Sequence, residues 1–379
     1  MRRYYILAIV LISIIVIAPT PTFAQNHNGD RPCLPNIYAP IQTDCIPLEV
    51  SEDPPPIEPD SQVGSVSLPS YTLDTELSYL PYYYGRVNKT SIPLYLSLDA
   101  AVAGEPVYRY IEPGFDFITY IDFAEVEGKK FYMIAPGVWM HADGVSRVYA
   151  PDFQGFGFYE TPARPFGWAL YPMQASPEPG IVYDEPERYD FWQYDPVEIY
   201  ETTFVGGVEW FRVGPNQWLD GRQVSRVTPN TTAPDGVDND RWIEVNLADQ
   251  SLAVYEAGQL VFATVISTGL PGTWTQPGLF QIYLMKETET MSGSFTADRS
   301  DYYYLEDVPW TMYFDEARAL HGTYWHNGFG VPRSRGCVNL SPGDAQWIFN
   351  WAQEGDWVYV WDPSGETPTD PALYGSGGA

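Results

Sequence analysis

The chain is poor in basic residues, in histidine and in cysteine. Its 379 residues include 20 lysines and arginines against 49 aspartates and glutamates, so its formal net charge is −29 at pH 7. An acidic excess of this size repels polyanions, and we therefore expect no nucleic-acid partner. The simplest role for the charge is to keep the protein soluble.

Long apolar runs are also missing, except near the beginning. Residues 4–18 are apolar, follow Arg2 and Arg3, and precede the segment 22–24, which together form the pattern of a secretory signal with its cleavage site. The run is shorter than the ~20 residues that cross a bilayer, so an uncleaved anchor is the weaker alternative. We expect residues 1–24 to be a signal peptide, the protein to be secreted, and no stable membrane insertion.

The three cysteines divide into a close pair and a single residue. Cys33 and Cys45 lie near each other in a protein predicted to be exported, where disulfides persist, and we expect them to be bridged. They belong to residues 25–62, which also include the acidic, proline-rich linker 51–60. Cys337 is the odd cysteine, which in a secreted protein indicates a reactive thiol or an intermolecular partner.

An internal repeat follows the linker. Residues 128–148 recur as residues 207–227, each position 79 residues further on. Both copies are rich in aromatic and β-branched residues between glycine and proline turns, so each is predicted to be a small all-β unit. We place the two copies at residues 63–150 and 151–230.

The two copies resemble the Src-homology-3-like barrels of bacterial wall proteins. Trp139 and Trp218 occupy equivalent positions, where they would form either a stacking platform for glycan or peptide, or a core anchor common to both barrels. Duplication favours the core anchor. His141 corresponds to Asp220, which argues against a metal or catalytic role required of each copy, and we interpret His141 as a surface residue.

A histidine and the odd cysteine share one short segment near the end of the chain. A cysteine with a pKa near ~8.5 is only a few per cent thiolate at neutral pH, so a catalytic one needs a nearby base or converging backbone N–H groups. His321 is a candidate base for Cys337, and Gly336 allows a tight turn that aims N–H groups at one point. Taken alone, either side chain is more commonly part of a core.

Within this segment His321-Gly322-Thr323 is followed by Ser334, Gly336-Cys337 and Asn339. This order resembles the signature of the L,D-transpeptidase (YkuD-like) catalytic domain of bacterial cell-wall synthesis. The resemblance extends over residues 241–361, whose beginning is similar to the opening hairpin of that domain.

Two positions depart from the family pattern. Arg335 stands where many members carry a second histidine, and other members tolerate a basic residue at the same place, so the resemblance does not carry the role of that histidine over to this chain. Gln276 stands where proline is usual, with Pro277 displaced by one, and we expect this to alter only a loop.

We therefore predict a mainly β chain, in which two small β-barrel repeats are followed by a YkuD-like β-sandwich catalytic domain. Near the start of that domain Ile243 and Val245 alternate with Trp242 and Glu244, as expected of a strand whose two faces are differently solvated.

A short helix and a final strand are predicted after the cysteine. Ser341-Pro342 opens a helix that continues over residues 345–353, because it supplies a capping side chain and an early proline. Residues 358–361 close the sheet. Residues 362–379 are predicted to be a disordered tail.

The resemblance implies a mechanism for peptidoglycan cross-linking. Cys337 would attack the carbonyl between the third residue and the terminal D-alanine of a stem peptide, forming a thioester. His321 would act as base and then as acid, and the N–H groups of Gly336 and Cys337 would hold the oxyanion. An amine of a second stem would resolve the thioester. The expected partners are therefore donor and acceptor stem peptides, and the expected location is the cell wall.

Neighbouring polar residues have expected supporting roles. Ser334 would steady the turn, Asn339 would lie beside the nucleophile and Thr323 would help to orient the base, although each is as readily a satisfied turn residue. His326 is the main alternative to His321 as the base. No cofactor is implied, and no metal site either, because two histidines five apart lack the further ligands that zinc takes.

Two other functions stay open. One is a non-catalytic wall-binding protein in which the repeats bind and the last domain is a relic. The other is an L,D-carboxypeptidase of the same fold, because transfer and hydrolysis differ only in the access of the acceptor. The sequence carries no mark of the oligomeric state, the acceptor amine, the donor's third residue or the ligand of the repeats.

Overall fold

The computed structural model describes residues 68–89, 91–111, 117–181, 189–294 and 302–374. The predicted signal peptide, the Cys33–Cys45 pair and the linker lie outside these residues. Residues 58–379 form one compact unit. Within the described ranges no helix is long and apolar enough to cross a membrane.

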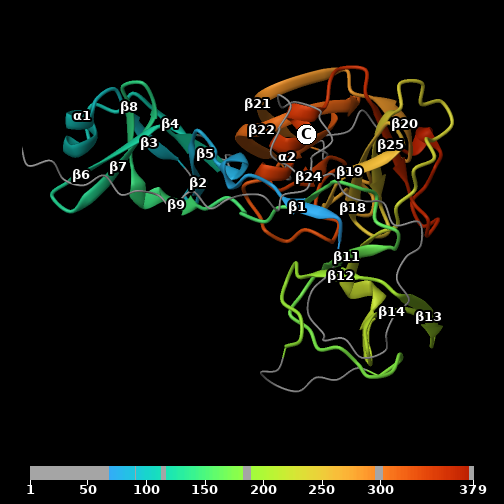
Figure 1. The fold of residues 1–379 in the computed structure, drawn as a ribbon. Helices are drawn as coiled ribbons and strands as arrows, with labels where there is room; N and C mark the ends of the chain where they lie inside the picture. Colours follow the sequence, from blue (N-terminus) through green and yellow to red (C-terminus); the bar gives the residue numbers. More distant parts are fainter. Residues whose placement is uncertain (1–67, 90, 112–116, 182–188, 295–301, 375–379) are drawn as a thin grey trace, which may run out of the picture. The chain divides into compact units, whose positions relative to one another are not determined.

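Strands dominate the described chain, and the mainly β fold class predicted from the sequence is confirmed. The elements of the C-terminal domain are drawn in yellow to red in Figure 1. They are β17 (Arg241–Asn246), β18 (Ser251–Glu256), β19 (Gln259–Val265), β20 (Gly278–Gln281), β21 (Leu284–Gly293), β22 (Tyr303–Asp315), β23 (Arg318–Gly322), β24 (Val338–Leu340), α2 (Pro342–Trp351) and β25 (Trp357–Trp361).

Two sheets build this domain, and both include strands from earlier in the chain. The first has the order β1-β10-β19-β18-β17-β25-β20, where β1 is Ser70–Thr72 and β10 is Phe156–Phe158. The second has the order β24-β23-β22-β5-β2-β9, with β21 paired to β22. Here β2 (Tyr83–Val87), β5 (Phe117–Tyr120) and β9 (Val145–Val148) belong to the first repeat.

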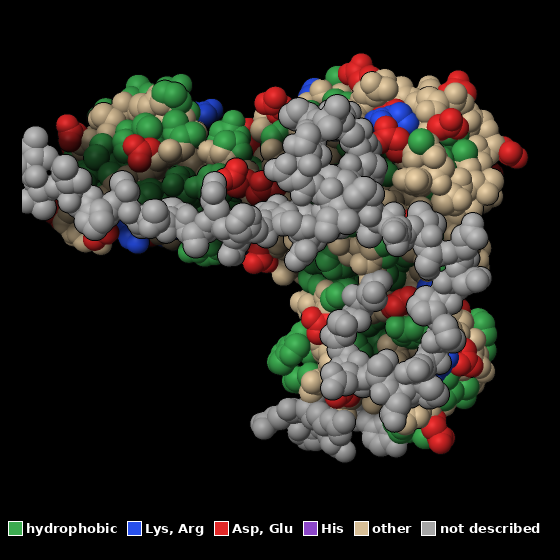
Figure 2. Space-filling view, viewed as in Figure 1, with side chains coloured by type: hydrophobic (Ala, Val, Ile, Leu, Met, Phe, Trp, Pro, Cys, Tyr) green, Lys and Arg blue, Asp and Glu red, His purple; other side chains and the backbone are tan. Residues whose placement is uncertain are grey.

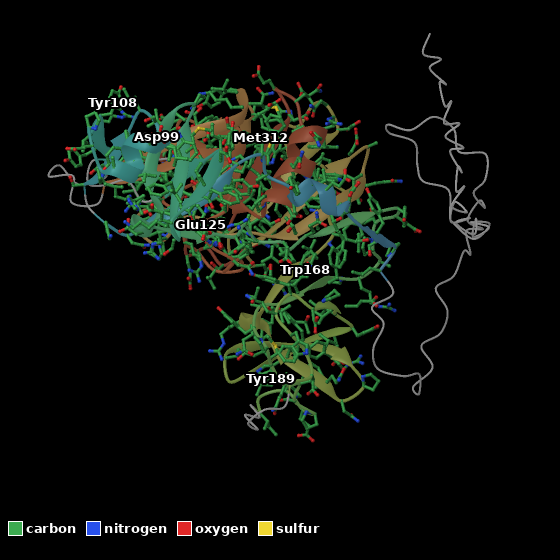
Figure 3. The ribbon with its side chains drawn as sticks, turned by 90° about the vertical axis from the view of Figure 1, so that its left-hand side faces the viewer. Asp99, Tyr108, Glu125, Trp168, Tyr189 and Met312 are labelled. Carbon is green, nitrogen blue, oxygen red and sulfur yellow. The ribbon has the colours of Figure 1, made fainter. Side chains whose placement is uncertain are left out.

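Apolar side chains of the two sheets and of α2 meet in one core, as in a sandwich. Met312, which Figure 3 labels, is a fully buried member from β22. Other members are Ile243, Val245, Leu252, Val254, Phe262, Leu320, Val338, Leu340 and Ile348.

Both faces of β17 are covered, which corrects the prediction of differently solvated faces. Ile243 and Val245 belong to the sandwich core, whereas Trp242 is 1% exposed and belongs to a second apolar cluster. That cluster also contains Phe166 and Trp168 of the second repeat. The repeat therefore buries the face of β17 that the sequence pattern assigns to solvent.

The two repeats contain equivalent strands at the offset seen in the sequence. In the first repeat they are β6 (Asp122–Val126), β7 (Lys129–Ala135), β8 (Val138–His141) and β9; in the second they are β13 (Glu201–Val205), β14 (Val208–Gly214), β15 (Gln217–Asp220) and β16 (Val224–Val227). All four pairs are offset by 79 residues at both ends. The sequence repeat is therefore also a structural one.

Other strands of the repeats correspond through their pairing. β2 pairs with β5 and β9, as β11 (Phe166–Ala169) pairs with β12 (Pro196–Glu198) and β16. The first repeat also contains β3 (Ile92–Tyr95), α1 (Leu98–Ala103) and β4 (Arg109–Ile111).

The equivalent tryptophans of the repeats are half-buried. The buried side chains come one position later, where Met140 and Leu219 belong to the cores of the two repeats. Trp139 and Trp218 thus flank these cores. His141 is half-buried as well, with its ring centroid 4.4 Å from that of Phe131.

The helix predicted after Cys337 is present. Ser341 caps it by accepting the N–H of Asp344, and Pro342 is its first residue. The helix ends at Trp351, two residues before the predicted end, because Ala352 has left the helical conformation.

Residues 362–374, within the predicted disordered tail, make hydrogen bonds and a ring contact. The carboxylate of Asp362 accepts the N–H groups of Ser364 and Thr367, which closes a turn. The ring of Tyr374 lies 5.3 Å from the guanidinium of Arg318. A turn that satisfies its own backbone and an aromatic anchor against a cation hold this segment in place.

One sign of charge dominates the surface. Acidic side chains are spread over the coloured parts of the face in Figure 2, with few basic ones among them. Two arginines each pair with two carboxylates, Arg226 with Glu209 and Asp249, and Arg241 with Glu256 and Asp356. Some of the few basic side chains thus form ion pairs within the fold.

Candidate active site

Two neighbouring parallel strands carry the predicted base and nucleophile. His321 lies on β23, and Cys337 directly precedes β24. His321 is opposite Asn339 in the parallel register of these strands. If the same register is continued one position beyond Leu320 and Val338, Cys337 lies opposite Ala319, which is two residues before His321.

Side chains on these strands alternate between the core and the candidate site. Leu320 and Val338 are opposite each other and belong to the sandwich core. Successive residues of a strand point to opposite faces, so His321, Cys337 and Asn339 share the other face. The fold thus brings together three of the predicted site residues.

His321 is buried and held in one tautomer. Its side chain is 2% exposed, and its Nδ1 lies 3.1 Å from the carbonyl oxygen of Gly322. A carbonyl oxygen only accepts, so Nδ1 carries the proton and Nε2 keeps its lone pair. Burial lowers the pKa of His321 to about 4, against an opposing effect of the Gly322 bond. The ring is therefore neutral at pH 7, and Nε2 is its basic nitrogen.

Cys337 is buried as well, with 3% of its surface exposed. Its Sγ lies 3.8 Å from the carbonyl oxygen of Ala317. Burial raises the pKa of the thiol to about 11, while a backbone hydrogen bond from Ala319 and the charge of Arg318 act to lower it. The resting pair at pH 7 is therefore a neutral thiol and a neutral imidazole.

The turn before Cys337 is tied by Ser334. Its hydroxyl donates to the carbonyl oxygen of Cys337 at 2.5 Å and accepts the N–H of Gly336 at 3.1 Å. The hydroxyl of Thr275 donates to the carbonyl oxygen of Gly336 at 2.8 Å and accepts the N–H of Gly269. The turn is thus held by its own residue Ser334 and by Thr275 of a neighbouring loop.

Gly336 has a backbone that few other residues adopt. Its φ is +120°, and a Cβ there would lie 3.1 Å from Nε of Arg318. Its N–H, predicted to bind the oxyanion, donates to Ser334 in this state. This amide has to exchange its partner before it binds a substrate oxygen.

Asn339 lies between the two histidines of the segment. Its backbone pairs with His321, and its Nδ2 lies 3.4 Å from Nε2 of His326. Nδ1 of His326 accepts the N–H of Gly328 at 3.3 Å. Both ring nitrogens of His326 are therefore engaged within its own surroundings, whereas Nε2 of His321 has no hydrogen bond among the described residues.

Thr323 is buried, but it does not orient the base. Its N–H donates to the carbonyl oxygen of Leu340 at 2.8 Å, and its hydroxyl has no hydrogen-bond partner in the described part of the chain. The carbonyl of Gly322 orients the ring of His321 instead.

Sequence reasoning missed several groups at this site. Arg318 is 4% exposed, and its guanidinium lies 2.7 Å from the carboxylate of Asp315. Its charge acts to lower the pKa of the Cys337 thiol, against the effect of burial. Its one signal in the sequence is a basic residue three positions before the predicted base. Thr275 is distant in the sequence and has no such signal. By contrast, Arg335 is recognisable from the sequence as the residue at the position of the second family histidine, and its guanidinium lies 4.8 Å from the ring of Tyr303.

No group of histidine, cysteine and acidic side chains in the described ranges has the arrangement of a metal site. What the site contains is a thiol, a basic imidazole nitrogen and a tied turn of backbone amides. These groups are suited to acyl transfer through a thioester.

Comparison with known proteins places this site within a recognised domain. Residues 240–360 match the family model of the YkuD L,D-transpeptidase catalytic domain. None of the curated proteins matches the chain.

Similar solved structures are also L,D-transpeptidases. The catalytic domain of the E. faecium L,D-transpeptidase is 28% identical, covers 33% of this chain and 100% of its own, and has a TM-score of 0.29. The enzyme of Stackebrandtia nassauensis is 28% identical, with coverages of 36% and 63% and a TM-score of 0.27. Mycobacterium tuberculosis L,D-transpeptidase 1 is 22% identical, with coverages of 32% and 61% and a TM-score of 0.28. The chain thus spans less than two thirds of the last two proteins.

Proposed function

We propose, from the match of residues 240–360 to the family model of the YkuD L,D-transpeptidase catalytic domain, that the protein is a secreted transpeptidase that cross-links peptidoglycan through a thioester on Cys337. The signal-like residues 1–24 support secretion, and the substrate of the reaction supports a location at the cell wall. The partners are a donor and an acceptor stem peptide.

One observation carries the proposal. His321 and Cys337 lie on one face of adjacent parallel strands, and the proton of the His321 ring is committed to the carbonyl of Gly322. The remaining nitrogen, Nε2, is the one that receives the thiol proton. A base and a nucleophile in this relation are what nucleophilic acyl transfer requires.

In the first half-reaction the Sγ of Cys337 attacks the carbonyl carbon between the third residue and the terminal D-alanine of the donor. The thiol proton passes to Nε2 of His321, and the resulting oxyanion is held by the N–H groups of Gly336 and Cys337. Each such donor contributes about 3 kcal/mol to the transition state. The C–N bond then breaks, and D-alanine leaves with the proton from His321.

In the second half-reaction an amine of the acceptor stem attacks the thioester carbonyl. The amine gives its proton to Nε2 of His321, the C–S bond breaks, and the sulfur takes the proton back. The product is an amide between two stems, and the enzyme returns to its neutral resting pair. No redox or cofactor step is needed for the atoms to balance.

The burial of the pair has a consequence for substrate entry. With the thiol pKa raised to about 11 and the imidazole pKa lowered to about 4, proton transfer accompanies the attack rather than preceding it. Side chains that cover Cys337 have to move aside when the donor binds. A dry site also keeps water from the thioester until the acceptor amine enters.

The test is mass analysis of wall fragments incubated with the protein. We expect dimers joined at the third residue, with loss of D-alanine. Cys337→Ala should abolish them, and His321→Gln should reduce their rate at least about a hundredfold, as removal of a general base does. His141→Gln, in the first repeat, is the matched control and should keep the wild-type rate.

Each rival function has its own outcome in this experiment. Shortened monomers without dimers would overturn transfer in favour of an L,D-carboxypeptidase. Fragments that bind without any change would indicate a non-catalytic wall protein. The E. faecium domain is known in a form acylated by ertapenem, so the mass of the protein after ertapenem treatment tests the thiol directly. The adduct should form on the wild type and be absent from Cys337→Ala.

A further inference from the structure

The loop that joins the base strand to the nucleophile, residues 323–336, contacts the second repeat. The hydroxyl of Tyr194 accepts the N–H of Phe329 and donates to the carbonyl oxygen of Asn327, each at 2.9 Å. Tyr194 comes from the connection between β11 and β12. A single hydroxyl thus bonds two backbone groups of the loop.

Tyr194 is itself held in place. Its φ is +68°, a left-handed conformation that is strained for a residue with a side chain, and its N–H donates to the carbonyl oxygen of Ala169 at 2.6 Å. Its ring centroid lies 4.3 Å from that of Phe153. Phe153 in turn lies 6.3 Å from the ring of Phe329. The contact is therefore built from both polar and apolar groups.

Hydrogen bonds continue from this loop to the active-site face. Gly328, between the two groups that Tyr194 holds, donates its N–H to Nδ1 of His326, which therefore carries its proton on Nε2. Nε2 lies 3.4 Å from the amide of Asn339. Oδ1 of Asn339 has no hydrogen-bond partner among the described residues, so the amide orientation that presents Oδ1 to Nε2–H satisfies both groups.

Asn339 ends this series of contacts beside the nucleophile. It shares a strand face with Cys337, and its backbone is paired both with His321 and with Ser267. Burial, and after it the charge of Arg333, lowers the pKa of His326 to about 4, so its ring stays neutral. A neutral ring is required for Nδ1 to accept from Gly328.

We propose that Tyr194 of the second repeat is a positioning residue for the transferase site, acting through the loop 327–329, His326 and Asn339. This rests on the proposed function, because the position of Asn339 matters only if Cys337 reacts. A displacement of about 1 Å at a reacting centre is enough to slow catalysis by one or two orders of magnitude. The second repeat is then part of the active site's scaffold.

Two tyrosines of the same repeat give a matched test. Tyr194→Phe removes one oxygen and both bonds to the loop. Tyr200→Phe also removes one oxygen, from a bond to Glu198 at 2.9 Å that does not involve the loop. We expect Tyr194→Phe to lower kcat about tenfold with KM within about twofold, and Tyr200→Phe to keep both values. Thermal unfolding of the two variants reports any general loss of stability.

The imidazole signals give a readout that needs no substrate. Long-range proton–nitrogen spectra should show the Nε2–H tautomer of His326 in the wild type and in Tyr200→Phe. In Tyr194→Phe the His326 signals should shift or broaden. A fall in kcat without a change at His326 would overturn the proposed route, and so would equal spectra and equal turnover in the two variants.

A double variant tests whether the groups act in one series. Tyr194→Phe combined with His326→Asn should turn over no more slowly than the slower single variant, whereas independent effects would multiply and contradict the proposal. The spectra also distinguish failure of the proposed function from failure of the proposed positioning role of Tyr194. If the wild type transfers no stem peptide, the proposed function fails, while the His326 signals still decide whether Tyr194 positions the loop.

Discussion

The two repeats present the same pair of strands to different surroundings. In the first repeat Arg86 on β2 is opposite Ser146 on β9, and both are exposed. In the second repeat the equivalent residues are Trp168 on β11 and Ser225 on β16, and both are fully buried. These two positions are thus exposed in one copy and packed into an apolar cluster in the other, while the first repeat makes its apolar contact through Tyr84, whose ring stacks on that of Tyr324 at a centroid distance of 3.7 Å. Figure 3 labels Trp168, the residue that makes this difference.

The contacts with the C-terminal domain differ in chemistry as well. The second repeat combines a neutral bond, from Ser225 to the carbonyl oxygen of Gln250, with an ion pair between Arg226 and Asp249. The first repeat uses carboxylates, because the N–H and hydroxyl of Thr119 on β5 donate to Glu306 and Asp307 of β22. Carboxylates of the C-terminal domain thus take part in both attachments, but they pair with a guanidinium in the second repeat and with an amide and a hydroxyl in the first.

The largest expected effect is on stability, where replacement of Trp168 should cost far more than replacement of the equivalent Arg86. Trp168→Ala should lower the free energy of unfolding by about 3 to 5 kcal/mol, because it removes a fully buried ring from the shared cluster. Arg86→Ala should change it by less than about 0.5 kcal/mol, as exposed substitutions do. Denaturant titration measures both values. Similar losses at the two positions would mean that the faces are not used differently.

The second prediction concerns Asp344, which holds the junction between the repeats by accepting the N–H of Gly155. Burial raises the pKa of Asp344 from 3.8 to about 7, so the folded protein holds this proton more tightly than the unfolded chain. The stabilising contribution is complete below pH 4 and is lost as the pH rises through 7. We expect the free energy of unfolding to fall by about 2 to 4 kcal/mol over this range.

Asp344→Asn is the control for this pH dependence. Asparagine keeps an oxygen for Gly155 but cannot ionise, so the part of the decline due to this group should disappear. Denaturant titrations at pH 4.5 and 7.5 compare the two proteins. An unchanged decline in the variant would assign the effect to other carboxyl groups.

A smaller effect is expected where the first repeat meets β22. Thr119→Val removes a hydroxyl that donates to Asp307 at 2.6 Å, and hydrogen bonds to charged groups contribute about 1.5 to 3 kcal/mol. Amide hydrogen exchange of β5 should accelerate accordingly, while exchange of β16 should stay at the wild-type rate. Thr202→Val, on an exposed position of the second repeat, is the control. Equal acceleration in β5 and β16 would contradict separate attachment of the repeats.

The smallest expected difference is between the two equivalent serines. Ser225→Ala should cost about 1 kcal/mol, because it leaves the carbonyl of Gln250 with one bond fewer in a buried place. Ser146→Ala should cost less than about 0.5 kcal/mol, since its hydroxyl accepts only from the exposed Asn88. The difference between the two midpoints in urea is the relevant measurement. If the two serine variants lost the same stability, Trp168 alone would distinguish the two equivalent strand pairs.

Local signals were sufficient for much of the fold and for the choice of candidate residues. Aromatic and β-branched runs between turns predict a mainly β chain, which is confirmed, and Ser341-Pro342 predicts where α2 begins. The candidate pair of a histidine and Cys337 comes from residue types in one short segment, and the choice of His321 over His326 comes from the family resemblance. Such features depend on neighbours in the sequence, so the sequence by itself determined them.

Only the tertiary structure decided which distant segments complete the site. Tyr194 bonds the loop of residues 323–336 and Thr275 bonds the turn at Gly336, each from far along the chain, and no periodicity in the sequence marks them. The neutral state of the resting pair was equally hidden, because desolvation depends on everything packed around Cys337. Long-range packing sets burial, and burial sets the pKa values on which the chemistry depends.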